Sequence, residues 1–440
     1  MIRLAHITDL HLRNAIPGTA PTAVRRSRTA MQHLTEALEE VARQKVDFLA
    51  VTGDLVDVPD FLTEGMPRGC EMPEFCTWEP KVREDYRPVK ELLERTGIPY
   101  RVLPGNHDHP AIFREIFPGH DAEIVCKGYR IVPFHDYEHD GHVPRRYLAS
   151  RLLFDAVLND ANLAPQIHLQ HYLFRPVPNA DYPYAYAEHA FLRKRIGESG
   201  RVRLCLSGHY HKGLFEPGAT TYAVTPAFCH ADRTWRIYEL DESGVRFETF
   251  SRPLPPPQPV VFLDRDGVIN DLDAYWYGPE EMRLIPGAAQ AIRRLNQAGY
   301  AVVVVTNQSA IGYGFVSEPI VRAVHERMHA LLAAGGAFVD AVYYTKSGGP
   351  ENNVVPGWDH LPTAKSSIVL QALNELPLDR DRSWIVGDRL TDLEAGEEAG
   401  LKAGFLVQTG RGRSEAAKAT KPVIVVADLA AAMEKILGVA

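Results

Sequence analysis

Short hydrophobic runs alternate with amphipathic stretches along the chain, and several of the runs end abruptly in charged residues. Such runs predict buried strands, whereas apolar positions that recur every three to four residues predict helices. In the first half, the pattern predicts strands over residues 4–8, 48–52 and 202–207, with a helix over residues 29–44. Strands separated by helices favour parallel pairing, so the first half is predicted to be α/β.

The second half shows the same alternation more regularly. Strands are predicted over residues 260–263, 300–306, 339–344 and 384–386, and helices over residues 288–298 and 320–334. This pattern is typical of a parallel α/β sheet, which carries its ligands beyond the carboxyl ends of its strands. In both halves the polar motifs described below follow predicted strands.

A proline-rich stretch divides the two halves. Residues 251–259 hold five prolines in nine positions, which favours an extended spacer of roughly 28 Å at most. A chain of 440 residues also exceeds the usual size of one hydrophobic core. We therefore predict one domain over residues 1–250, a linker over 251–259 and a second domain over 260–440. Residues 58–86 have little periodicity and are interpreted as an insertion, either a lid or a surface excursion.

Composition narrows the class of protein. Hydrophobic residues make up 45% and charged residues 24% of the chain, which is ordinary for a globular protein. The formal net charge of -8 argues against a dedicated nucleic-acid binder, although a nucleic-acid substrate stays open. The apolar run at the start is too short for a signal peptide or a membrane span, so we expect a cytoplasmic protein. The five scattered cysteines do not form a disulfide framework, and the oligomeric state is left open.

Histidines and carboxylates cluster in the first half, which holds 15 of the 18 histidines. Imidazole and carboxylate together suit divalent metals of the Mn, Fe and Zn class, and two such ions can clamp a phosphoryl group. Asp54 is the natural bridging ligand, because one carboxylate can bind both ions. The candidate ligands of the two ions are Asp9, His11, Asp54, Asn106, His171, His209 and His211.

The order of these motifs resembles the calcineurin-like metallophosphoesterases, within them the cyclic-nucleotide phosphodiesterase branch. The resemblance covers roughly residues 1–250 and implies a β-sandwich flanked by helices. It implies that Asp9, His11, Asp54 and His211 hold one metal, and that Asp54, Asn106, His171 and His209 hold the other. It also implies that His107 contacts the phosphate and protonates the leaving group, with Asp108 orienting it. The usual His-His-Pro of the family is here Gln170-His171-Tyr172, and Tyr172 is expected near the organic part of the ester. His168 and His6 are interpreted as structural, and Asp57 as a carboxylate behind the ligands.

The second half holds a different set of residues. Asp264 and Asp266 follow a predicted strand, where Asp264 would act as nucleophile and Asp266 as acid and then base. Donors for a phosphoryl group would come from Thr306, Asn307 and Lys365. Magnesium would be held by Asp388 together with Asp264 and Asp266.

This set resembles the haloacid-dehalogenase-like phosphatases, over nearly all of residues 260–440. The local sequence around Asp264, Thr306 and Asp388 is similar to that of the branch of histidinol-phosphate and heptose-bisphosphate phosphatases. This resemblance implies a Rossmann-like parallel sheet. Lys365 lies 23 residues before Asp388, close to the family spacing, and Lys346 is the alternative lysine. No cysteine occurs in residues 345–362, so the zinc loop of that branch is not expected. Tyr313 occupies a loop where relatives often carry an arginine.

The two motif sets together predict a bifunctional phosphoric-ester hydrolase. The first half would cleave a phosphodiester or a monoester with two metals, and the second a monoester with magnesium. A small sugar phosphate or nucleotide is the expected substrate, and the two steps could act in sequence. The alternatives are a nucleic-acid end-processing enzyme, or a chain in which one domain senses a phosphorylated ligand for the other.

Overall fold

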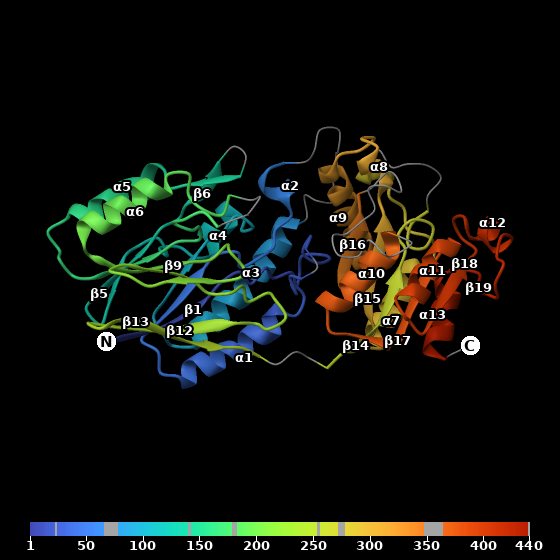
Figure 1. Ribbon diagram of the computed structural model, residues 1–440, viewed down its shortest axis with the longest axis horizontal. Coiled ribbons are helices and arrows are strands. Elements are labelled where there is room, and N and C mark those ends of the chain that lie inside the picture. The colour runs from blue at the N-terminus through green and yellow to red at the C-terminus, as the bar shows by residue number, and fades with distance from the viewer. Residues whose placement is uncertain are drawn as a thin grey trace. The chain divides into compact units, whose positions relative to one another are not determined.

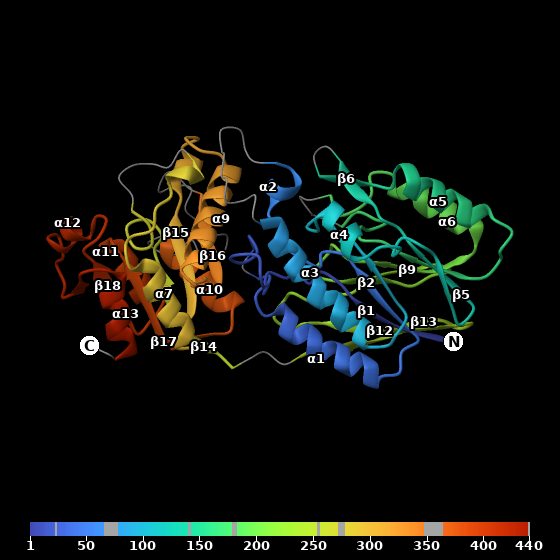
Figure 2. The same cartoon turned by 180° about the vertical axis from the view of Figure 1, so that it is seen from behind.

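The computed structural model describes residues 1–22, 24–65, 78–139, 142–177, 183–252, 256–271, 278–346 and 364–438. These residues form two compact units. The first unit contains the described residues up to 252, apart from a few between 17 and 24 and at 64–65, which cluster with the second. The second unit contains the described residues from 256 onwards. Figures 1 and 2 show both units, which are described separately below.

The first unit is built on two mixed sheets. One has the order β13-β12-β1-β2-β3 and the other the order β10-β11-β9-β8-β5-β4. In the first sheet β1, β2 and β3 pair in parallel, and β12 and β13 add antiparallel strands. The first sheet comprises β1 (Ile2–Ile7), β2 (Phe48–Thr52), β3 (Tyr100–Leu103), β12 (Trp235–Asp241) and β13 (Gly244–Phe250). The second comprises β4 (Ile124–Cys126), β5 (Tyr129–Pro133), β8 (Gln166–Leu169), β9 (Val202–Ser207), β10 (Leu214–Glu216) and β11 (Thr221–Val224).

The two sheets pack face to face. Leu4 and Phe48 of one sheet share a buried core with Ile167 and Leu204 of the other. Helices cover the outer faces, and α5 and α6 lie together on the second sheet (Figure 1). A short hairpin is formed by β6 (Tyr137–His139) and β7 (Val143–Arg145). The helices of this unit are α1 (Ala30–Arg43), α2 (Asp60–Thr63), α3 (Trp78–Arg95), α4 (Pro110–Ile116), α5 (Leu148–Asn159) and α6 (His189–Ser199).

The second unit is a single parallel sheet with the order β16-β15-β14-β17-β18-β19. Its strands are β14 (Gln258–Leu263), β15 (Ala301–Asn307), β16 (Ala341–Thr345), β17 (Leu378–Gly387), β18 (Ala403–Val407) and β19 (Ile424–Val426). A 3-10 turn, η2 (Pro279–Glu281), precedes the helices α7 (Ala288–Gln297), α8 (Ser309–Gly312) and α9 (Glu318–Ala334). Further along lie α10 (Ala364–Glu375), α11 (Leu390–Glu398), α12 (Gly412–Ala416) and α13 (Leu429–Leu437).

Alternate residues of β14 face opposite helix layers. Val261 and Leu263 lie in a core shared with α7, α9 and α13, whereas Val260 and Phe262 lie in a core shared with α10. Because strand side chains alternate in direction, a strand buried on both faces must be apolar throughout. The central run at residues 260–263 meets this requirement. Asp264, the first polar residue after it, marks the carboxyl end of the strand.

Both fold predictions are confirmed, and the strands at 48–52 and 202–207 have the predicted ends. The interpretation of residues 58–86 as an irregular insertion is wrong in its last part. Helix α3 begins at Trp78 and buries Val82 and Tyr86. Pro80 lies in its first turn, where a missing N–H costs little, and so does not break it. Residues 66–77, and the proposed linker at 253–255, lie outside the described residues. Among the described residues, no helix is long and apolar enough to cross a membrane.

Candidate active sites

The predicted metal ligands of the first unit come from loops at the carboxyl ends of parallel strands. Asp9 and His11 follow β1, Asp54 follows β2, and the remaining ligands follow β3, β8 and β9. Four of these residues have backbone φ in the left-handed region: Asp9 (56°), His11 (44°), Asp54 (52°) and His209 (64°). Residues other than glycine rarely adopt this backbone conformation, and such strain concentrates at functional sites.

The side chains form two groups that share Asp54. Asp9, His11 and Asp54 form one, and Asp54, His171 and His209 form the other. The Oδ2 atom of Asp54 lies 3.4 Å from Nε2 of His11 and 3.4 Å from Nε2 of His171. His211 joins the first group, with its Nε2 3.2 Å from that of His11. The Oδ1 atom of Asn106 joins the second, 3.2 Å from Nε2 of His171.

These distances fit two metal ions. Atoms bound to one ion at about 2.1 Å are separated by roughly 3.0–3.4 Å in tetrahedral or octahedral geometry. The distance from His209 Nδ1 to His171 Nε2 is 3.1 Å, and that from His211 Nε2 to Asp9 Oδ1 is 3.6 Å. Facing imidazole nitrogens need a proton or a metal ion between them, because two lone pairs repel. The residues present therefore suit two ions bridged by Asp54.

Hydrogen bonds behind the ligands aim the imidazole nitrogens. The Nδ1 of His171 lies 2.7 Å from the Thr52 carbonyl oxygen, so it donates its proton there and Nε2 faces the site. The Nδ1 of His11 lies 3.0 Å from Oδ1 of Asp57, which fixes that ring in the same way. Such partners set the tautomer and the ring orientation of a metal ligand. Asp57 thus lies behind the ligands, as predicted.

Electrostatics show how strongly the site requires positive charge. Burial would lower the pKa of His171, but the Asp54 and Asp9 carboxylates raise it to about 9. Burial raises the pKa of Asp9 to about 7. Burial would also raise the pKa of Asp54, yet the neighbouring histidines, led by His171, hold it well below its usual value. Without another cation, protons on the histidines balance the buried carboxylates.

The predicted partnership of His107 and Asp108 is wrong. Oδ1 of Asp57 lies 3.2 Å from Nδ1 of His107. Asp108 instead accepts hydrogen bonds from the backbone N–H groups of Leu55, Val56 and Gly105 and from the Tyr86 hydroxyl. Its oxygens are therefore occupied in bracing the loops that carry Asp54 and Asn106. Asp57 orients His107, and Asp108 supports the backbone.

Tyr172 also differs from its prediction. Its side chain is buried, and its ring meets those of His171 and His209 edge to face, with centroids 5.0 and 4.9 Å away. It packs behind the ligands, so it is not placed to touch the ester. His168 hydrogen-bonds Gln166, and His6 bonds Thr225 and Thr52. Both histidines are structural, as predicted.

Three residues that the motifs did not indicate lie at the first site. The Sγ of Cys229 lies within 4.8 Å of ligand nitrogens of His11 and His211. Nε2 of His230 lies 3.0 Å from Nδ1 of His211. Arg25 contacts His107 at 3.1 Å. Each is distant in sequence from the motif that it touches. The fold places them beside the first site. The backbone N–H of Cys229, for example, donates a hydrogen bond to the Asp9 carbonyl oxygen.

The second site lies at the carboxyl ends of β14 and β17. Asp264, Asp388 and Asp392 bring carboxylate oxygens within 4.8 Å of one another. The Nζ of Lys365 lies 3.0 Å from Asp264 and 2.5 Å from Asp392. Burial raises the pKa of Asp264 to about 7, although Lys365 opposes the shift. An all-oxygen set of buried carboxylates is the donor set that magnesium prefers, so the residues fit that ion.

Asp266 is not part of this carboxylate group, and its assignment as a metal ligand stays a prediction. It contacts Arg265 at 2.9 and 3.0 Å, Asn270 at 3.0 Å and Gln308 at 3.3 Å. Burial would raise its pKa, but Arg265 and these hydrogen bonds lower it to about 2. Asp392 takes its place beside Asp264 and Asp388. The acid–base interpretation of Asp266 stays a prediction.

The side chains predicted to bind the phosphoryl group lie at different distances from Asp264. Lys365 lies beside Asp264, whereas Lys346 is exposed and pairs with Glu318 at 2.6 Å. The Thr306 side chain is buried and accepts a hydrogen bond from Gln308 at 2.9 Å. Asn307 is exposed and contacts the Thr345 hydroxyl. Of the two lysines, only Lys365 lies where a phosphoryl group on Asp264 would need a cation.

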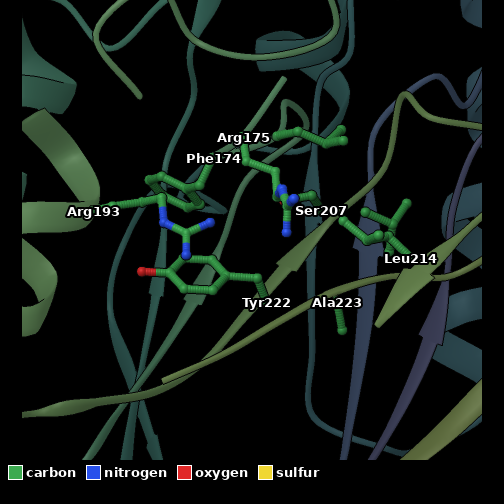
Figure 3. Close-up of a pocket in the computed structure, with 9 residues that line it drawn as sticks. Phe174, Arg175, Arg193, Ser207, Leu214, Tyr222 and Ala223 are labelled. Atoms are coloured by element: carbon green, nitrogen blue, oxygen red, sulfur yellow. The ribbon is translucent and has the colours of Figure 1, made fainter. Parts of the chain in front are cut away.

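A separate small pocket in the first unit is lined by Arg175, Arg193 and Tyr222 (Figure 3). Both arginines pair with Glu216 at 2.9 Å, and Arg193 also lies over the Tyr222 ring. The Glu216 carboxylate already occupies both guanidinium groups. This pocket is therefore a salt-bridged surface feature, and it contains none of the predicted site residues.

Comparison with protein families matches both halves of the chain. A model described as calcineurin-like phosphoesterase matches residues 2–213. A model described as haloacid dehalogenase-like hydrolase matches residues 221–397, and one described as HAD-hydrolase-like matches residues 364–432. The second match begins among β11, β12 and β13, which belong to the first unit.

Similar proteins have been described for part of the chain. The D-glycero-D-manno-heptose-1,7-bisphosphate 7-phosphatase of Thermosynechococcus vestitus is 41% identical over 187 residues, which cover 40% of this chain and 95% of that protein. The D-glycero-beta-D-manno-heptose-1,7-bisphosphate 7-phosphatase of Mesorhizobium japonicum is 42% identical over 184 residues, 40% of this chain and 82% of that protein. The crystal structure of a D,D-heptose 1,7-bisphosphate phosphatase from B. bronchiseptica with magnesium and phosphate matches with a TM-score of 0.38 and 37% identity. It covers 41% of this chain and 99% of that one.

Proposed function

Because the chain belongs to the calcineurin-like phosphoesterases through its first part and to the haloacid dehalogenase-like hydrolases through its second, it is a phosphoric-ester hydrolase, and we propose that it carries two independent active sites. The first would cleave a phosphodiester or a monoester with two divalent metals of the Mn, Fe and Zn class. The second would hydrolyse a phosphomonoester with magnesium. The observation that carries the proposal is the presence of two separate ligand groups, one shared through Asp54 and one around Asp264.

In the first site, bound metals would polarise the phosphoryl group and activate water. Asp9, His11, Asp54 and His211 would hold one ion, and Asp54, Asn106, His171 and His209 the other. His107 lies beside these ligands, 4.8 Å from the His11 ring between centroids. We assign it the contact with the ester and the transfer of a proton to the leaving oxygen. Asp57 would stabilise the imidazolium through Nδ1.

In the second site, a bound magnesium would neutralise charge on the phosphoryl group. One carboxylate oxygen of Asp264 would attack phosphorus and form an aspartyl phosphate. Asp266 would give a proton to the leaving alcohol, for which its contact with Arg265 has to be released so that the carboxylate can be protonated. Asp266 would then take a proton from the water that hydrolyses this intermediate. Lys365, fixed between Asp264 and Asp392, would hold the phosphoryl oxygens together with the Thr306 hydroxyl. Asn307 would contact the phosphate from the loop.

For the substrate of the second site, we propose a small sugar phosphate. The two curated relatives described above act, by their names, on heptose bisphosphates. Their matched length, near 40% of this chain, corresponds to the size of the second unit. A nucleotide is the next candidate, since the same chemistry serves any small monoester. For the first site, the imidazole and carboxylate ligands support cleavage of a phosphoric-ester bond by two divalent metals of the Mn, Fe and Zn class.

Two single substitutions test the proposal of independent sites. Asp54→Asn removes the shared carboxylate, and Asp264→Asn removes the nucleophile. We expect Asp54→Asn to abolish hydrolysis of bis-p-nitrophenyl phosphate with Mn²⁺ present and to leave p-nitrophenyl phosphate hydrolysis with Mg²⁺ intact. Asp264→Asn should do the reverse.

Metal content, measured by mass spectrometry, accompanies both assays. If either substitution abolishes both activities, or if neither has an effect, the chain does not have two independent sites. A sugar-phosphate panel with phosphate release as readout then addresses the substrate. Release from sugar bisphosphates slower than from every nucleotide would remove the sugar-phosphate proposal.

A further inference from the structure

Arg25 reaches the first site from the connection between β1 and α1, outside every motif that identified that site. Its Nη1 atom lies 3.1 Å from Nε2 of His107 and 3.1 Å from Oδ1 of Asp57. The side chain is 16% exposed, so it lies between the buried ligands and solvent. A guanidinium in this position meets whatever binds beside His107.

Asp57 does not need Arg25 for its own charge. The fully buried Arg13 donates a hydrogen bond from Nε to Oδ2 of Asp57 at 3.1 Å, and its Nη2 lies 3.0 Å from the same oxygen in an ion pair. His11 and His107 also point their Nδ1 atoms at Oδ1 of the same carboxylate, at 3.0 and 3.2 Å. One carboxylate is therefore shared by two guanidinium groups and two imidazoles. Asp57 therefore keeps Arg13 as a cationic partner when Arg25 moves away.

The contact with His107 is the second observation. Nδ1 of His107 donates its proton to Asp57, so Nε2 of the neutral ring carries a lone pair, which accepts a hydrogen bond from Arg25. A protonated ring would instead direct an N–H at the guanidinium. In either state, Arg25 occupies the nitrogen that has to face the leaving oxygen. For His107 to reach an ester, Arg25 has to move off that nitrogen and find an anionic partner.

We propose that Arg25 is a phosphate-binding residue of the first site, which exchanges its contact with His107 for the phosphoryl oxygens of the ester. This assignment rests on the proposed function of that site. The planar fork of a guanidinium matches two phosphate oxygens, and charge-assisted bonds of this kind are strong. Binding of the ester then also frees Nε2 of His107. Arg25 couples occupation of the site to availability of its proton donor.

The test compares Arg25→Ala, Arg25→Lys and the control Arg43→Ala, because Arg43 is an exposed residue of α1 that pairs with Glu40. In the Mn²⁺-loaded full chain, inorganic phosphate is the competitive inhibitor of bis-p-nitrophenyl phosphate hydrolysis. We expect Arg25→Ala to raise both the KM of the diester and the Ki of phosphate by about 10- to 100-fold, the range for a lost charge-assisted bond. Arg25→Lys should recover part of the phosphate affinity, and Arg43→Ala should resemble the wild type.

A purely positioning role gives a different result. If Arg25 only holds Asp57 and His107 in place, Arg25→Ala lowers kcat and leaves the Ki of phosphate unchanged, which would overturn the proposal. Hydrolysis of p-nitrophenyl phosphate with Mg²⁺ reports on folding of the variant chain. Phosphate titration by calorimetry, with Mn²⁺ bound, measures the same affinity without turnover. Weaker binding in Arg25→Ala supports the role of Arg25 even if the wild type fails to cleave the diester, whereas equal binding overturns it.

Discussion

At the scale of single residues, the candidate metal ligands of the first site are oriented by groups that lie behind them. Asp57 contacts His11 and His107, and the Thr52 carbonyl fixes His171. The motifs alone predicted the side chains that meet around Asp54, because each lies in a loop that follows a strand. They misassigned the partner of His107, since Asp108 is its neighbour in sequence whereas Asp57 is its neighbour in space. Contacts across 50 residues depend on how loops fold back, and local spacing does not encode that.

The buried side chain of His168 makes the stability of the folded chain depend on pH. It lies on β8 beside the rings of Phe134 and Phe154, and its Nε2 hydrogen-bonds Oε1 of Gln166 at 2.8 Å. Burial, assisted by Arg146 and Arg130, holds its pKa well below 6.5. The folded chain thus excludes a proton that the unfolded chain accepts below pH 6.5. The stabilising contribution is complete above that pH and is lost as the pH falls.

We expect His168→Phe to flatten this dependence. Urea unfolding followed by circular dichroism at pH 7, 6 and 5 should show a slope smaller by up to about 1.4 kcal/mol per pH unit. Loss of the bond to Gln166 should add a cost of about 1–3 kcal/mol that does not vary with pH. His139→Gln is the matched control, because that side chain is exposed. An unchanged slope in His168→Phe would show that His168 is protonated in the folded chain.

At the scale of elements, the strand ends determine where chemistry occurs. The apolar runs predicted β2 and β9 closely, because continuous burial leaves few alternatives to a strand. The same reasoning missed α3, whose Pro80 and Pro88 and many charged residues hide its buried stripe. Its partners, including Tyr86 against Asp108, become visible only in three dimensions. In α3, tertiary packing overrides the low local helix propensity of the sequence.

Gly53 shows how closely the loop after β2 approaches its neighbours. Its φ is +99°, and a Cβ atom there would lie 2.5 Å from Nδ1 of His171 and 2.8 Å from the Gly105 nitrogen. We expect Gly53→Ala to displace Asp54 or His171, because neither neighbour can move without disturbing a ligand. The φ strain alone should cost about 1–3 kcal/mol. Bis-p-nitrophenyl phosphate hydrolysis and bound metal should both fall, the latter measured by mass spectrometry.

Gly97→Ala provides the matched control for that substitution. Gly97 also has a positive φ, +66°, but nothing lies within 4 Å of a Cβ placed there. It should lose stability through backbone strain and keep full metal content and activity. If Gly53→Ala retains its metals and its diesterase activity, the close approach of these loops is not required for the site.

At the scale of the whole molecule, two units of different architecture place their candidate sites in the same way. Each places its acidic residues beyond the carboxyl ends of parallel strands, at Asp9 and Asp54 in one unit and at Asp264 and Asp388 in the other. The donor sets nevertheless differ. Six histidines surround or support the first group, namely His11, His107, His171, His209, His211 and His230, whereas the second group consists of carboxylates with a lysine between them. This difference in donor type followed from the sequence, because histidines are concentrated in the first half.

The difference in donors predicts different metal requirements. After both sites are stripped with a chelator, Mg²⁺ should restore hydrolysis of p-nitrophenyl phosphate but not that of bis-p-nitrophenyl phosphate, because Mg²⁺ prefers oxygen ligands and binds imidazole poorly. Mn²⁺ accepts both donor types and should restore both reactions. The Asp264→Asn chain, treated in parallel, should recover diester hydrolysis with Mn²⁺ and should not recover p-nitrophenyl phosphate hydrolysis with Mg²⁺. Recovery of diester hydrolysis with Mg²⁺ alone would mean that the imidazoles of the first site are not its principal ligands, and the assignment of His11, His171, His209 and His211 would have to be withdrawn.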